Sequence, residues 1–520
     1  MIHMPDDVSP SRRPARTSAR DGRAVPWPQL RQRLQQAGLV RGVRRGDEAP
    51  RPTDVHLDHL ADDSRKVRAN GGFIAVRGTE ADGHSFIDNA IQNGAQLVVC
   101  ETVPNAARTQ YPQVLFVQVT DSRRALAALA AEFYGNPADE LRVVGITGTN
   151  GKTTVAFLVH HMLDALGEPT GLLSTVEVRT GVVATNATLT TPGPLELHRT
   201  FRRMVDDGCS TCAMEVSSHA LDQDRVHTVG YGVAVFTNLT SDHLDYHESI
   251  TAYRNAKKKL FDDLDADATA VVNADDDAAP AMVEDTRARI LTYGLRSLAD
   301  VPVQVLDSTI DGLRLRIDGH ERSFRLAGRF NAYNLAAAYG TGRALGHDAD
   351  AVLDALAQVP PVPGRFETLR FDDGTTVVVD YAHTPDALEN ILQAIVATTG
   401  DDATLWCVFG CGGDRDRSKR RVMGTIAEHY AERLIVTSDN PRSEEPGAIT
   451  NDIRRGMDRP GDAQWIVDRE AAIRAAAEQC APGDVVLIAG KGHETHQTIG
   501  TEKRPFDDRD VAHTYFSAQH

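Results

Sequence analysis

Residues 145–154 have the sequence Gly-Ile-Thr-Gly-Thr-Asn-Gly-Lys-Thr-Thr, which follows the apolar pair Val143-Val144 and opens an apolar-periodic helix. A glycine-rich turn between a strand and a helix can hold a phosphate on backbone N–H groups and on the positive end of the helix dipole. Lys152 can neutralise the phosphate, and a threonine hydroxyl can ligate Mg²⁺. Five residues separate Gly145 from Gly151, one more than in the common phosphate loop. The order of strand, Gly-Lys-Thr and helix favours a phosphate-binding loop over a chance glycine-rich turn.

Composition sets the outer bounds of fold and function. The chain has 520 residues, of which 41% are hydrophobic and 25% charged, so it should fold as about three soluble globular domains. The formal net charge of −17 argues against nucleic acid or an anionic membrane as the main partner. No apolar stretch approaches the roughly 18 residues that a membrane span needs. Residues 1–25 carry Arg, Ser and Pro without an apolar core, so we expect a disordered tail rather than a secretory signal.

The cysteines are thinly scattered, at Cys100, Cys209, Cys212, Cys407, Cys411 and Cys480. This is too few for a disulfide framework in a chain of this length and favours a reducing, cytoplasmic location. Cys209 and Cys212 match Cys-x-x-Cys, but no second pair stands at zinc-ligand spacing. We therefore expect buried thiols rather than a redox or zinc site.

The pattern of strands and helices divides the chain into three α/β blocks, at residues 26–140, 141–362 and 363–520. In the first block, residues 85–93 have a helical pattern between two short strands. The second block begins with the phosphate loop and predicts a mostly parallel sheet that is covered on both faces. The sequence Pro-Pro-Val-Pro-Gly at 360–364 breaks the pattern and indicates a linker.

The third block predicts a second, Rossmann-like open sheet, with ligands expected beyond the carboxyl ends of its strands. The strands expected across the whole chain are 72–76, 96–99, 211–216, 232–236, 269–272, 375–379, 405–409, 433–437 and 484–489.

Three groups of polar side chains in the second block could serve a bound nucleotide. Glu215 ends a predicted strand, where a carboxylate can reach a Mg²⁺ ion on the phosphate loop or simply face solvent. His243 and His247 are four residues apart, so one helical turn would place them on one face, as a surface pair or as metal ligands, with Mg²⁺ favoured over Zn²⁺. The run 257–259 is Lys-Lys-Lys and, on spacing alone, predicts a solvated helix face.

These elements belong to a longer series of motifs that occur in order from about residue 60 to the C-terminus. The series comprises Thr147-Gly148-Thr149-Asn150-Gly151-Lys152-Thr153, Glu215-Val216-Ser217-Ser218-His219, Asn238 with Asp242-His243-Leu244-Asp245-Tyr246-His247, Tyr253-x-x-Ala256-Lys257, Phe330-Asn331-x-x-Asn334, Pro363-Gly364-Arg365-x-Glu367 and Asp380-Tyr381-Ala382-His383-Thr384-Pro385. Most of them are weak signals alone, but their ordered co-occurrence is specific. The chain resembles the ATP-dependent Mur ligases.

Two further features resemble the branch of that family that adds diaminopimelate. Asp63-Ser64-Arg65-Lys66-Val67, with Gly72-x-x-Ala75 and Asp82-Gly83-His84-x-Phe86, is similar to the branch's uridine-nucleotide domain. Asp439-Asn440-Pro441-Arg442 is similar to its amino-acid recognition motif, and lysine-adding relatives lack this arginine. Residues before about 50 match nothing in the family pattern.

The resemblance implies an enzyme of peptidoglycan synthesis that uses ATP and Mg²⁺. Its substrates would be UDP-N-acetylmuramoyl-L-alanyl-D-glutamate and meso-2,6-diaminopimelate, joined through an acyl phosphate by a monomeric cytoplasmic protein. The first block would bind the UDP-sugar, the second ATP and the third the amino acid. Phosphoryl transfer of this kind needs positioning and charge neutralisation more than covalent help.

The resemblance also implies roles for single residues. Lys152, Lys257 and His243 would be catalytic, with Mg²⁺ near Thr153, Glu215, His243 and Lys257, the last as a carbamate (N6-carboxylysine) because a lysine of depressed pKa can react with CO₂. ATP would contact Gly148, Thr149, Asn150, Gly151, Lys152, Thr153, Thr154, Asn331, Arg365, Asp380, Tyr381 and His383. The UDP-muramoyl-dipeptide would contact Ser64, Thr190, Thr191, Ser217, Gln223 and Arg225.

For diaminopimelate the resemblance implies Arg415, Asp439, Asn440, Arg442, Gly490 and Glu494. The chemistry of the ligand supports this set, because the unreacted end of diaminopimelate offers a carboxylate to an arginine fork and an ammonium to an acid. Arg442 and Glu494 each follow a predicted strand and supply both charges. An exposed charge pair and a plain turn at Asn440-Pro441 are the structural alternatives.

Three other functions remain open at the level of sequence. A lysine-adding Mur ligase would share most of the motifs. A P-loop ATPase would turn over ATP without an acceptor, and a nucleotide-binding regulator would bind without turnover. Folate-polyglutamate ligases share the central motifs but lack this kind of uridine-nucleotide block.

Overall fold

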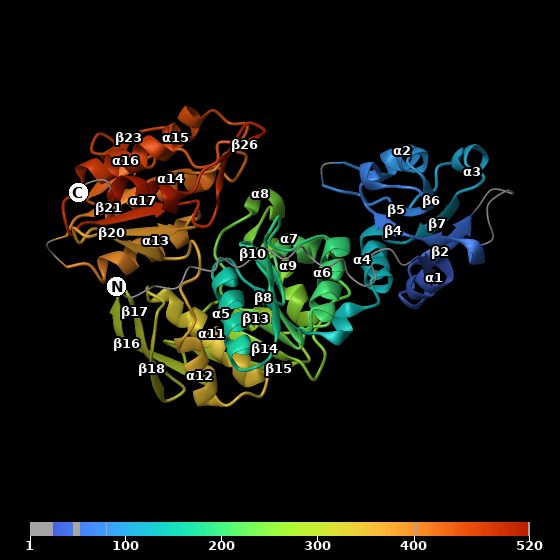
Figure 1. Cartoon of the computed structure of the whole chain (residues 1–520), viewed down its shortest axis with the longest axis horizontal. Helices are drawn as coiled ribbons and strands as arrows, with labels where there is room; N and C mark the ends of the chain where they lie inside the picture. Colours follow the sequence, from blue (N-terminus) through green and yellow to red (C-terminus); the bar gives the residue numbers. More distant parts are fainter. Residues whose placement is uncertain (1–23, 45–51, 80, 401–402, 518–520) are drawn as a thin grey trace, which may run out of the picture. The chain divides into compact units, whose positions relative to one another are not determined.

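The computed structural model describes residues 24–44, 52–79, 81–400 and 403–517 (Figure 1). It divides into two compact units, which we describe separately. The first comprises Met1–Glu140, Arg179–Thr185 and Pro194–Cys209, and the second Leu141–Val178, Asn186–Gly193 and Ser210–His520. Of the tail predicted at 1–25, residues 1–23 lie outside the described residues, and Val25 belongs to strand β1 (Val25–Pro26), which pairs with β3 (His56–Leu57).

The first unit contains a five-stranded sheet in the order β2-β7-β6-β5-β4. Its neighbours are parallel except for β2 and β7. Side chains that alternate along a strand point to opposite faces, so Leu97 and Val98 belong to two separate cores and the sheet is covered on both sides. The strands are β2 (Val40–Arg44), β4 (His59–Ala61), β5 (Gly71–Ile74), β6 (Ala95–Cys100) and β7 (Leu115–Val119).

Helices α1 (Trp27–Gln36), α4 (Ser122–Phe133) and α6 (Pro194–Asp206) contribute to one core of this sheet, and α2 (Ile87–Gln92) contributes to the other. The helix predicted at 85–93 is α-helical only from Ile87. Its first turn is a 3₁₀ helix, Gly83–Phe86, because the Asp82 carboxylate accepts the backbone N–H of His84 and tightens the turn.

The second unit begins with a long sheet in which β9-β12-β8-β13-β14-β15-β16 are parallel neighbours and β17 and β18 follow antiparallel. Strands β10 (Glu177–Thr180) and β11 (Val183–Asn186) belong to the same sheet. The remaining bounds are β8 (Arg142–Thr147), β9 (Thr170–Leu173), β12 (Thr211–Glu215), β13 (Val233–Phe236), β14 (Thr269–Asn273), β15 (Arg289–Gly294), β16 (Val301–Thr309), β17 (Gly312–Ile317) and β18 (His320–Phe324).

Register brings three strand ends to one place on this sheet. Glu215 of β12 lies opposite Ile146 of β8, and Phe236 of β13 lies opposite Thr147. The residues that follow β8, β12 and β13 therefore emerge together at the carboxyl edge, where ligands of parallel sheets bind. The predicted strand ends in this block are confirmed to within one or two residues.

Helices α5 (Lys152–Ala165), α11 (Phe330–Ala344) and α12 (Ala349–Ala357) pack into one core on this sheet (Figure 1). Their buried faces are rich in Ala, Val and Leu, such as Val155, Ala337 and Leu353, so the helices approach one another closely. The other helices of this part are α7 (Ser218–Asp222), α8 (Leu244–His247), α9 (Ile250–Asp262) and α10 (Ala279–Met282).

The C-terminal part, orange to red in Figure 1, is the predicted second open sheet, in the order β19-β20-β24-β21-β22-β23. Only β19 is antiparallel to its neighbour. The strands are β19 (Glu367–Arg370), β20 (Thr376–Asp380), β21 (Leu405–Phe409), β22 (Arg433–Val436), β23 (Gln464–Trp465) and β24 (Val485–Ala489), and a hairpin of β25 (His496–Ile499) and β26 (Glu502–Pro505) follows.

Helices cover both faces of this sheet, as the two separate cores around Leu392 and Ile473 show. One core receives α13 (Pro385–Val396), α14 (Ser418–Tyr430) and α15 (Pro446–Arg454). The other receives α16 (Arg469–Gln479) and α17 (Asp508–Phe516). The α/β class predicted from the sequence is confirmed.

The segment predicted as a linker contains neither helix nor strand between the end of α12 and the start of β19. It is nevertheless packed, because Val362 is buried and a Cβ at Gly364 would lie 2.1 Å from the backbone N of His493. Gly364 has φ +65°, so glycine is required here on two grounds. This close approach fixes the backbone from which Arg365 projects.

In the described part of the chain, no helix is long and apolar enough to cross a membrane. The six cysteines are free thiols, and all but Cys480 are buried. The expectation of buried thiols at Cys209 and Cys212 is confirmed.

Candidate active site

The phosphate loop connects β8 to α5 and is shaped by two glycines with positive φ. A Cβ at Gly148 would lie 1.9 Å from the hydroxyl of Thr237, and one at Gly151 would lie 2.5 Å from Oδ1 of Asn334. Both glycines therefore let the loop backbone approach its neighbours more closely than any other residue could. The loop leads straight into Lys152, the first residue of α5, so its N–H groups and the helix dipole face the same point.

The residues that follow β13 hold this loop in place. Asn238 Oδ1 accepts the backbone N–H of Asn150 at 2.9 Å, and its backbone oxygen accepts that of Thr149 at 2.8 Å. Thr237 Oγ1 donates to the Asn150 oxygen at 2.6 Å. The loop is preorganised by these bonds, so a bound phosphate would not have to order it.

Two lysines converge on one carbonyl oxygen of the loop. Nζ of Lys152 lies 3.0 Å from the Gly148 oxygen, and Nζ of Lys257 lies 2.7 Å from the same atom. Lys257 is 1% exposed and rests over the ring of Tyr253, 4.4 Å from its centroid. Burial, and then the nearby Lys152, hold the pKa of Lys257 well below its usual range. The solvated face predicted for 257–259 from spacing alone is wrong at Lys257, because α9 buries this side chain against the loop.

The neighbours of Lys257 are less buried. Lys258 forms ion pairs with Asp262 and Asp285, and the side chain of Lys259 is 45% exposed. Only the residue of the run that faces the phosphate loop is fully enclosed.

A buried carboxylate and a buried hydroxyl lie at the same edge. Glu215 is 1% exposed and accepts from the backbone N and the hydroxyl of Thr175, at 2.6 and 3.2 Å. Thr153 is 4% exposed, and its hydroxyl accepts from Nη2 of Arg365 at 3.0 Å. Among the described residues no group of three or more His, Cys, Asp or Glu side chains forms a metal site. This donor set fits Mg²⁺, which needs few protein ligands when a nucleotide supplies the other oxygens.

The predicted histidine pair brackets a third histidine. His243 precedes α8 with φ +55°, so the two residues are not on one regular helical face. The ring of His219 lies 4.8 Å from that of His243 and 5.4 Å from that of His247. Burial lowers the pKa of His219 to about 4 and also lowers that of His243. Burial therefore favours the neutral form of the His219 and His243 rings.

The residues predicted for the muramoyl-dipeptide form a connected network, apart from Ser64. Thr191 Oγ1 donates to the backbone oxygen of Glu215 at 2.8 Å and accepts the backbone N–H of Ser217 at 3.0 Å. Arg225 donates to the Thr191 oxygen and to Oε1 of Gln223. Thr190 joins through the hydroxyl of Thr175 at 3.1 Å. Ser64 belongs to the first unit, where it is buried and its backbone oxygen accepts from Asn93 Nδ2.

A single cavity of about 760 Å³ collects most of the residues predicted for ATP and catalysis, a size that suits a nucleotide. Its lining includes Thr149, Asn150, Gly151, Lys152, Thr153, Thr154, Thr190, Glu215, Ser217, His243, Lys257, Arg365, Asp380, Tyr381 and His383. Gly148, Thr191, Gln223, Arg225 and Asn331 do not line it. Asn331 is engaged within the protein, donating to the Ala327 oxygen and accepting from Asn334, so Asn334 is the amide that faces the cavity.

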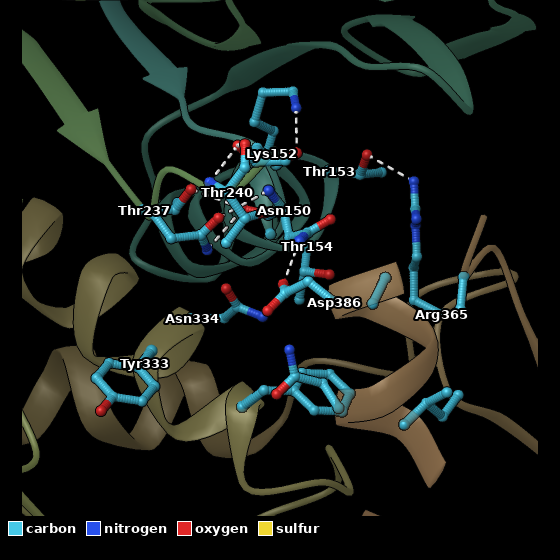
Figure 2. Close-up of a pocket in the computed structure, with 18 of the residues that line it drawn as sticks. Asn150, Lys152, Thr153, Thr154, Thr237, Thr240, Tyr333, Asn334, Arg365 and Asp386 are labelled. Atoms are coloured by element: carbon cyan, nitrogen blue, oxygen red, sulfur yellow. Dashed lines mark hydrogen bonds between the residues drawn. The ribbon is translucent and has the colours of Figure 1, made fainter. Parts of the chain in front are cut away.

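Residues after 363 contact the phosphate loop directly (Figure 2). Asn150 Nδ2 donates to Oδ2 of Asp386 at 2.7 Å, and Arg365 bonds Thr153 and lies over the ring of Tyr381. Both oxygens of Asp380 accept backbone N–H groups, from Phe366 and Ala382. Asp380 thus shapes the loop that carries Arg365 and Tyr381.

The residues predicted for diaminopimelate gather at the carboxyl edge of the C-terminal sheet. Asp439, Asn440 and Arg442 follow β22, and Gly490 and Glu494 follow β24. Asn440 Nδ2 donates to Glu494 Oε2 at 2.7 Å, and a Cβ at Gly490 would lie 3.6 Å from the Asp439 carboxyl carbon.

The electrostatics of this cluster are set by burial. Burial and then the nearby Arg415 lower the pKa of Arg442, and burial raises the pKa of Asp439. None of the six predicted residues lines the 760 Å³ cavity.

Several residues of the site had no individual role in the sequence prediction. Tyr253 and Asn334 stood inside quoted motifs, and Asp386 follows one directly, so a wider reading of those motifs could have found them. Thr175, which bonds Glu215, follows a plain apolar strand and carries no sequence signal. Lys491 stands beside a predicted residue but was not singled out.

Three family descriptions match the chain in order. Residues 56–134 match "Mur ligase family, catalytic domain", residues 146–342 match "Mur ligase middle domain", and residues 364–492 match "Mur ligase, glutamate ligase domain". Together they cover most of the described residues.

Curated relatives and a solved structure agree with the family descriptions. The UDP-N-acetylmuramoyl-L-alanyl-D-glutamate–2,6-diaminopimelate ligase of Parabacteroides distasonis is 44% identical over 90% of this chain and 96% of its own length. That of Cytophaga hutchinsonii is 45% identical over 88% and 94%. A solved structure of a ligase with the same name is 32% identical and covers 96% of this chain and 100% of its own, with a TM-score of 0.65. The chain belongs to the Mur ligase family.

Proposed function

We propose that the protein is an ATP-dependent ligase that joins meso-diaminopimelate to UDP-N-acetylmuramoyl-L-alanyl-D-glutamate in peptidoglycan synthesis. The observation that carries the proposal is the shared cavity, where the phosphate loop, two lysines and a buried carboxylate meet residues that follow position 363. The names of relatives at 44% and 45% identity support the choice of substrates.

The first step is phosphoryl transfer from ATP to the side-chain carboxylate of D-glutamate. A carboxylate oxygen forms a bond to the γ-phosphorus, and the bond to the β–γ bridging oxygen breaks, so ADP leaves and an acyl phosphate remains. The loop N–H groups and Lys152 hold the phosphates and neutralise their charge. Thr153 and Glu215 would hold a Mg²⁺ ion and His243 would lie near a second one, and these ions would supply further charge neutralisation. Arg365 reaches the same edge and offers a guanidinium to the nucleotide.

Lys257 has the surroundings of a lysine that reacts with CO₂. A second ammonium beside Lys152 on one carbonyl oxygen is electrostatically unfavourable, and burial favours the neutral amine. A neutral amine can add to CO₂ and lose a proton to give a carbamate. The product gives this side chain a negative charge, which would balance Lys152 and Mg²⁺.

In the second step the amine of diaminopimelate attacks the acyl carbon. The new C–N bond replaces the bond to the phosphate oxygen, inorganic phosphate leaves, and the nitrogen loses its proton. Recognition of the distal end rests with Arg442 for the carboxylate and with Asp439 and Glu494 for the ammonium. Nη1 of Arg442 donates to the backbone oxygen of Gly413 at 2.7 Å, which anchors the guanidinium at this edge.

The remaining predictions stay predictions. They are the domain assignments 26–140, 141–362 and 363–520, the contact of Ser64 with the uridine diphosphate, the cytoplasmic location, the monomeric state and the lack of a nucleic-acid partner.

The test is ADP release by the purified protein, with the UDP-muramoyl-dipeptide and either diaminopimelate or L-lysine as acceptor. We expect ADP release that requires the dipeptide and diaminopimelate together. ADP release in the absence of both amino acids would favour a P-loop ATPase. Binding of ATP without any ADP release would favour a nucleotide-binding regulator. Equal release with L-lysine would favour the lysine-adding alternative.

A further inference from the structure

We propose that Lys491 is a positioning residue for amino-acid recognition, which fixes Glu494 and Asn440 so that one oxygen of Glu494 faces the distal ammonium of the substrate. The inference rests on the proposed function and extends it to a residue that does not itself contact the substrate.

The ammonium of Lys491 is enclosed and fully used by the protein. The side chain is 0% exposed. Nζ donates to Glu494 Oε2 at 2.9 Å, to the His496 oxygen at 2.6 Å and to Asn440 Oδ1 at 3.3 Å. An ammonium has three N–H groups, so none is left for a ligand. Lys491 can therefore act on the substrate only through its neighbours.

These bonds tie the segment that follows β24 to Asn440, which is distant in the sequence. Asn440 follows β22, Glu494 follows β24, and His496 begins the β25–β26 hairpin. The same hairpin bonds the first segment again, because Thr498 N donates to Asn440 Oδ1 at 2.9 Å and Gln497 Nε2 donates to the Asp439 oxygen at 2.7 Å. Lys491 is the charged centre of this junction.

The junction leaves carboxylate oxygens available for a cation. Both protein bonds of the Glu494 carboxylate go to Oε2, from Asn440 and Lys491. Within the described residues Oε1 accepts no hydrogen bond, and Oδ1 of the buried Asp439 has no partner. Two partly unsatisfied acids whose charges act on each other suit an ammonium, and a buried group without a partner is otherwise costly.

Lys491 also keeps Glu494 ionised. Burial pushes the pKa of Glu494 upward, but Lys491 and the bond from Asn440 outweigh it and the pKa is lowered. The other charged groups that act on this site are Arg442, Arg469 and Asp439, and the titratable rings are Tyr381, His493 and His496.

The experiment compares Lys491→Met and Lys491→Gln with the wild type and with Lys503→Met. The control removes one positive charge from the exposed strand β26 of the same hairpin. We expect the KM for diaminopimelate to rise roughly 10-fold to 100-fold in both Lys491 variants, the range seen when a supporting residue is lost. The KM for ATP should stay within about twofold, and Lys503→Met should match the wild type. Lys491→Gln serves as the test if the methionine variant does not fold.

A pH profile separates positioning from general stabilisation. Without Lys491 the pKa of Glu494 rises, so as the pH falls this carboxylate is protonated at a higher pH than in the wild type. The protonated acid loses its attraction for the ammonium of the substrate. The KM for diaminopimelate should therefore increase as the pH falls from about 8 to about 6 in Lys491→Met, relative to the wild type. Adding Glu494→Gln should abolish this extra slope, because the titrating group is gone.

Two results would overturn the inference. One is a folded Lys491 variant with an unchanged KM for diaminopimelate. The other is a raised KM whose extra pH slope is missing or survives Glu494→Gln. Wild-type protein that released no ADP with diaminopimelate would instead refute the proposed function, and the inference with it.

Discussion

The carboxyl edges of the two large sheets carry their positive charge in opposite ways. At the phosphate loop, Lys152 and Lys257 share one carbonyl oxygen, and neither forms an ion pair with a carboxylate of the residues that the structure describes. At the C-terminal edge, Lys491 is paired with Glu494 and the buried Arg469 is paired with Asp508. The first edge leaves two amines without a direct carboxylate partner in the described part of the chain, and this arrangement suits a polyanion. The second is nearly balanced and suits a zwitterion.

The lysines at the two edges therefore have different roles. A buried lysine without a counter-ion either has a lowered pKa or binds an anionic ligand. A buried cation with every N–H satisfied holds its neighbours in place.

The largest effect concerns the choice between diaminopimelate and L-lysine. L-Lysine lacks the second carboxylate and would leave Arg442 unpaired in a desolvated site. Sites of this kind reject the analogue by roughly 10³-fold to 10⁵-fold in kcat/KM. Arg442→Ala should raise the KM for diaminopimelate and narrow the preference, with little change in the KM for ATP. An unchanged preference in Arg442→Ala would show that another group selects the amino acid.

The second effect is on stability at the balanced edge. Arg469 and Asp508 are both 0% exposed, and Arg469 also donates to the backbone oxygens of Ser438 and Ala489, just before Asp439 and Gly490. Asp508→Ala leaves this arginine buried without its partner and should cost about 3–5 kcal/mol of the free energy of unfolding.

Urea unfolding followed by tryptophan fluorescence measures this loss, because Trp406 and Trp465 both lie in the C-terminal part. Arg474→Ala is the control, since it breaks an exposed pair with Glu478 on the same helix. A loss in Asp508→Ala no larger than that of the control would contradict the role of the buried pair.

The third effect is on catalysis at the phosphate loop. Lys152→Ala should reduce the rate of ADP formation by roughly 10²-fold to 10³-fold while the protein stays folded, because the substitution removes the positive charge that neutralises the transferring phosphate. Initial rates and a melting curve together measure this. Near-normal turnover by a folded Lys152→Ala protein would contradict the assignment of residues 145–154 as the loop that binds the phosphates of ATP.

The smallest of these effects concerns Lys257. Lys257→Ala should lose most of its activity, and added short carboxylates should restore part of the acyl-phosphate step by replacing the carbamate. Lys259→Ala, on the exposed side of the same helix, is the matched control. Wild-type activity in Lys257→Ala, or an intact mass showing only the free amine in an active preparation, would exclude the carbamate.

The sequence predicted those features that depend on local pattern. Glycine placement and apolar runs determine backbone conformation locally. They predicted the phosphate loop, the strand ends at Glu215 and Phe236, and the second open sheet. The break at 360–364 follows from proline in the same way. The late start of the α-helix at Ile87 is a local feature too, but it depends on the single bond from the backbone N–H of His84 to Oδ1 of Asp82.

Features that depend on packing were not predictable from spacing. Lys257, Lys258 and Lys259 are indistinguishable as a run, and only the contact of α9 with the loop decides which one is buried. Asn331 and Asn334 share one motif, yet only Asn334 faces the cavity because Asn331 bonds the Ala327 oxygen. Lys491 acquires its partners from a hairpin and a strand end that are brought together only in the fold.

The most direct test of the account is a competition experiment read by mass spectrometry. The wild-type protein receives ATP, Mg²⁺, the UDP-muramoyl-dipeptide and equal concentrations of diaminopimelate and L-lysine, and the mass of the product identifies the amino acid that was added. The account predicts the dipeptide plus diaminopimelate less one water, with the lysine product below about one part in a thousand. Comparable amounts of both products, or no amide product at all, would contradict it.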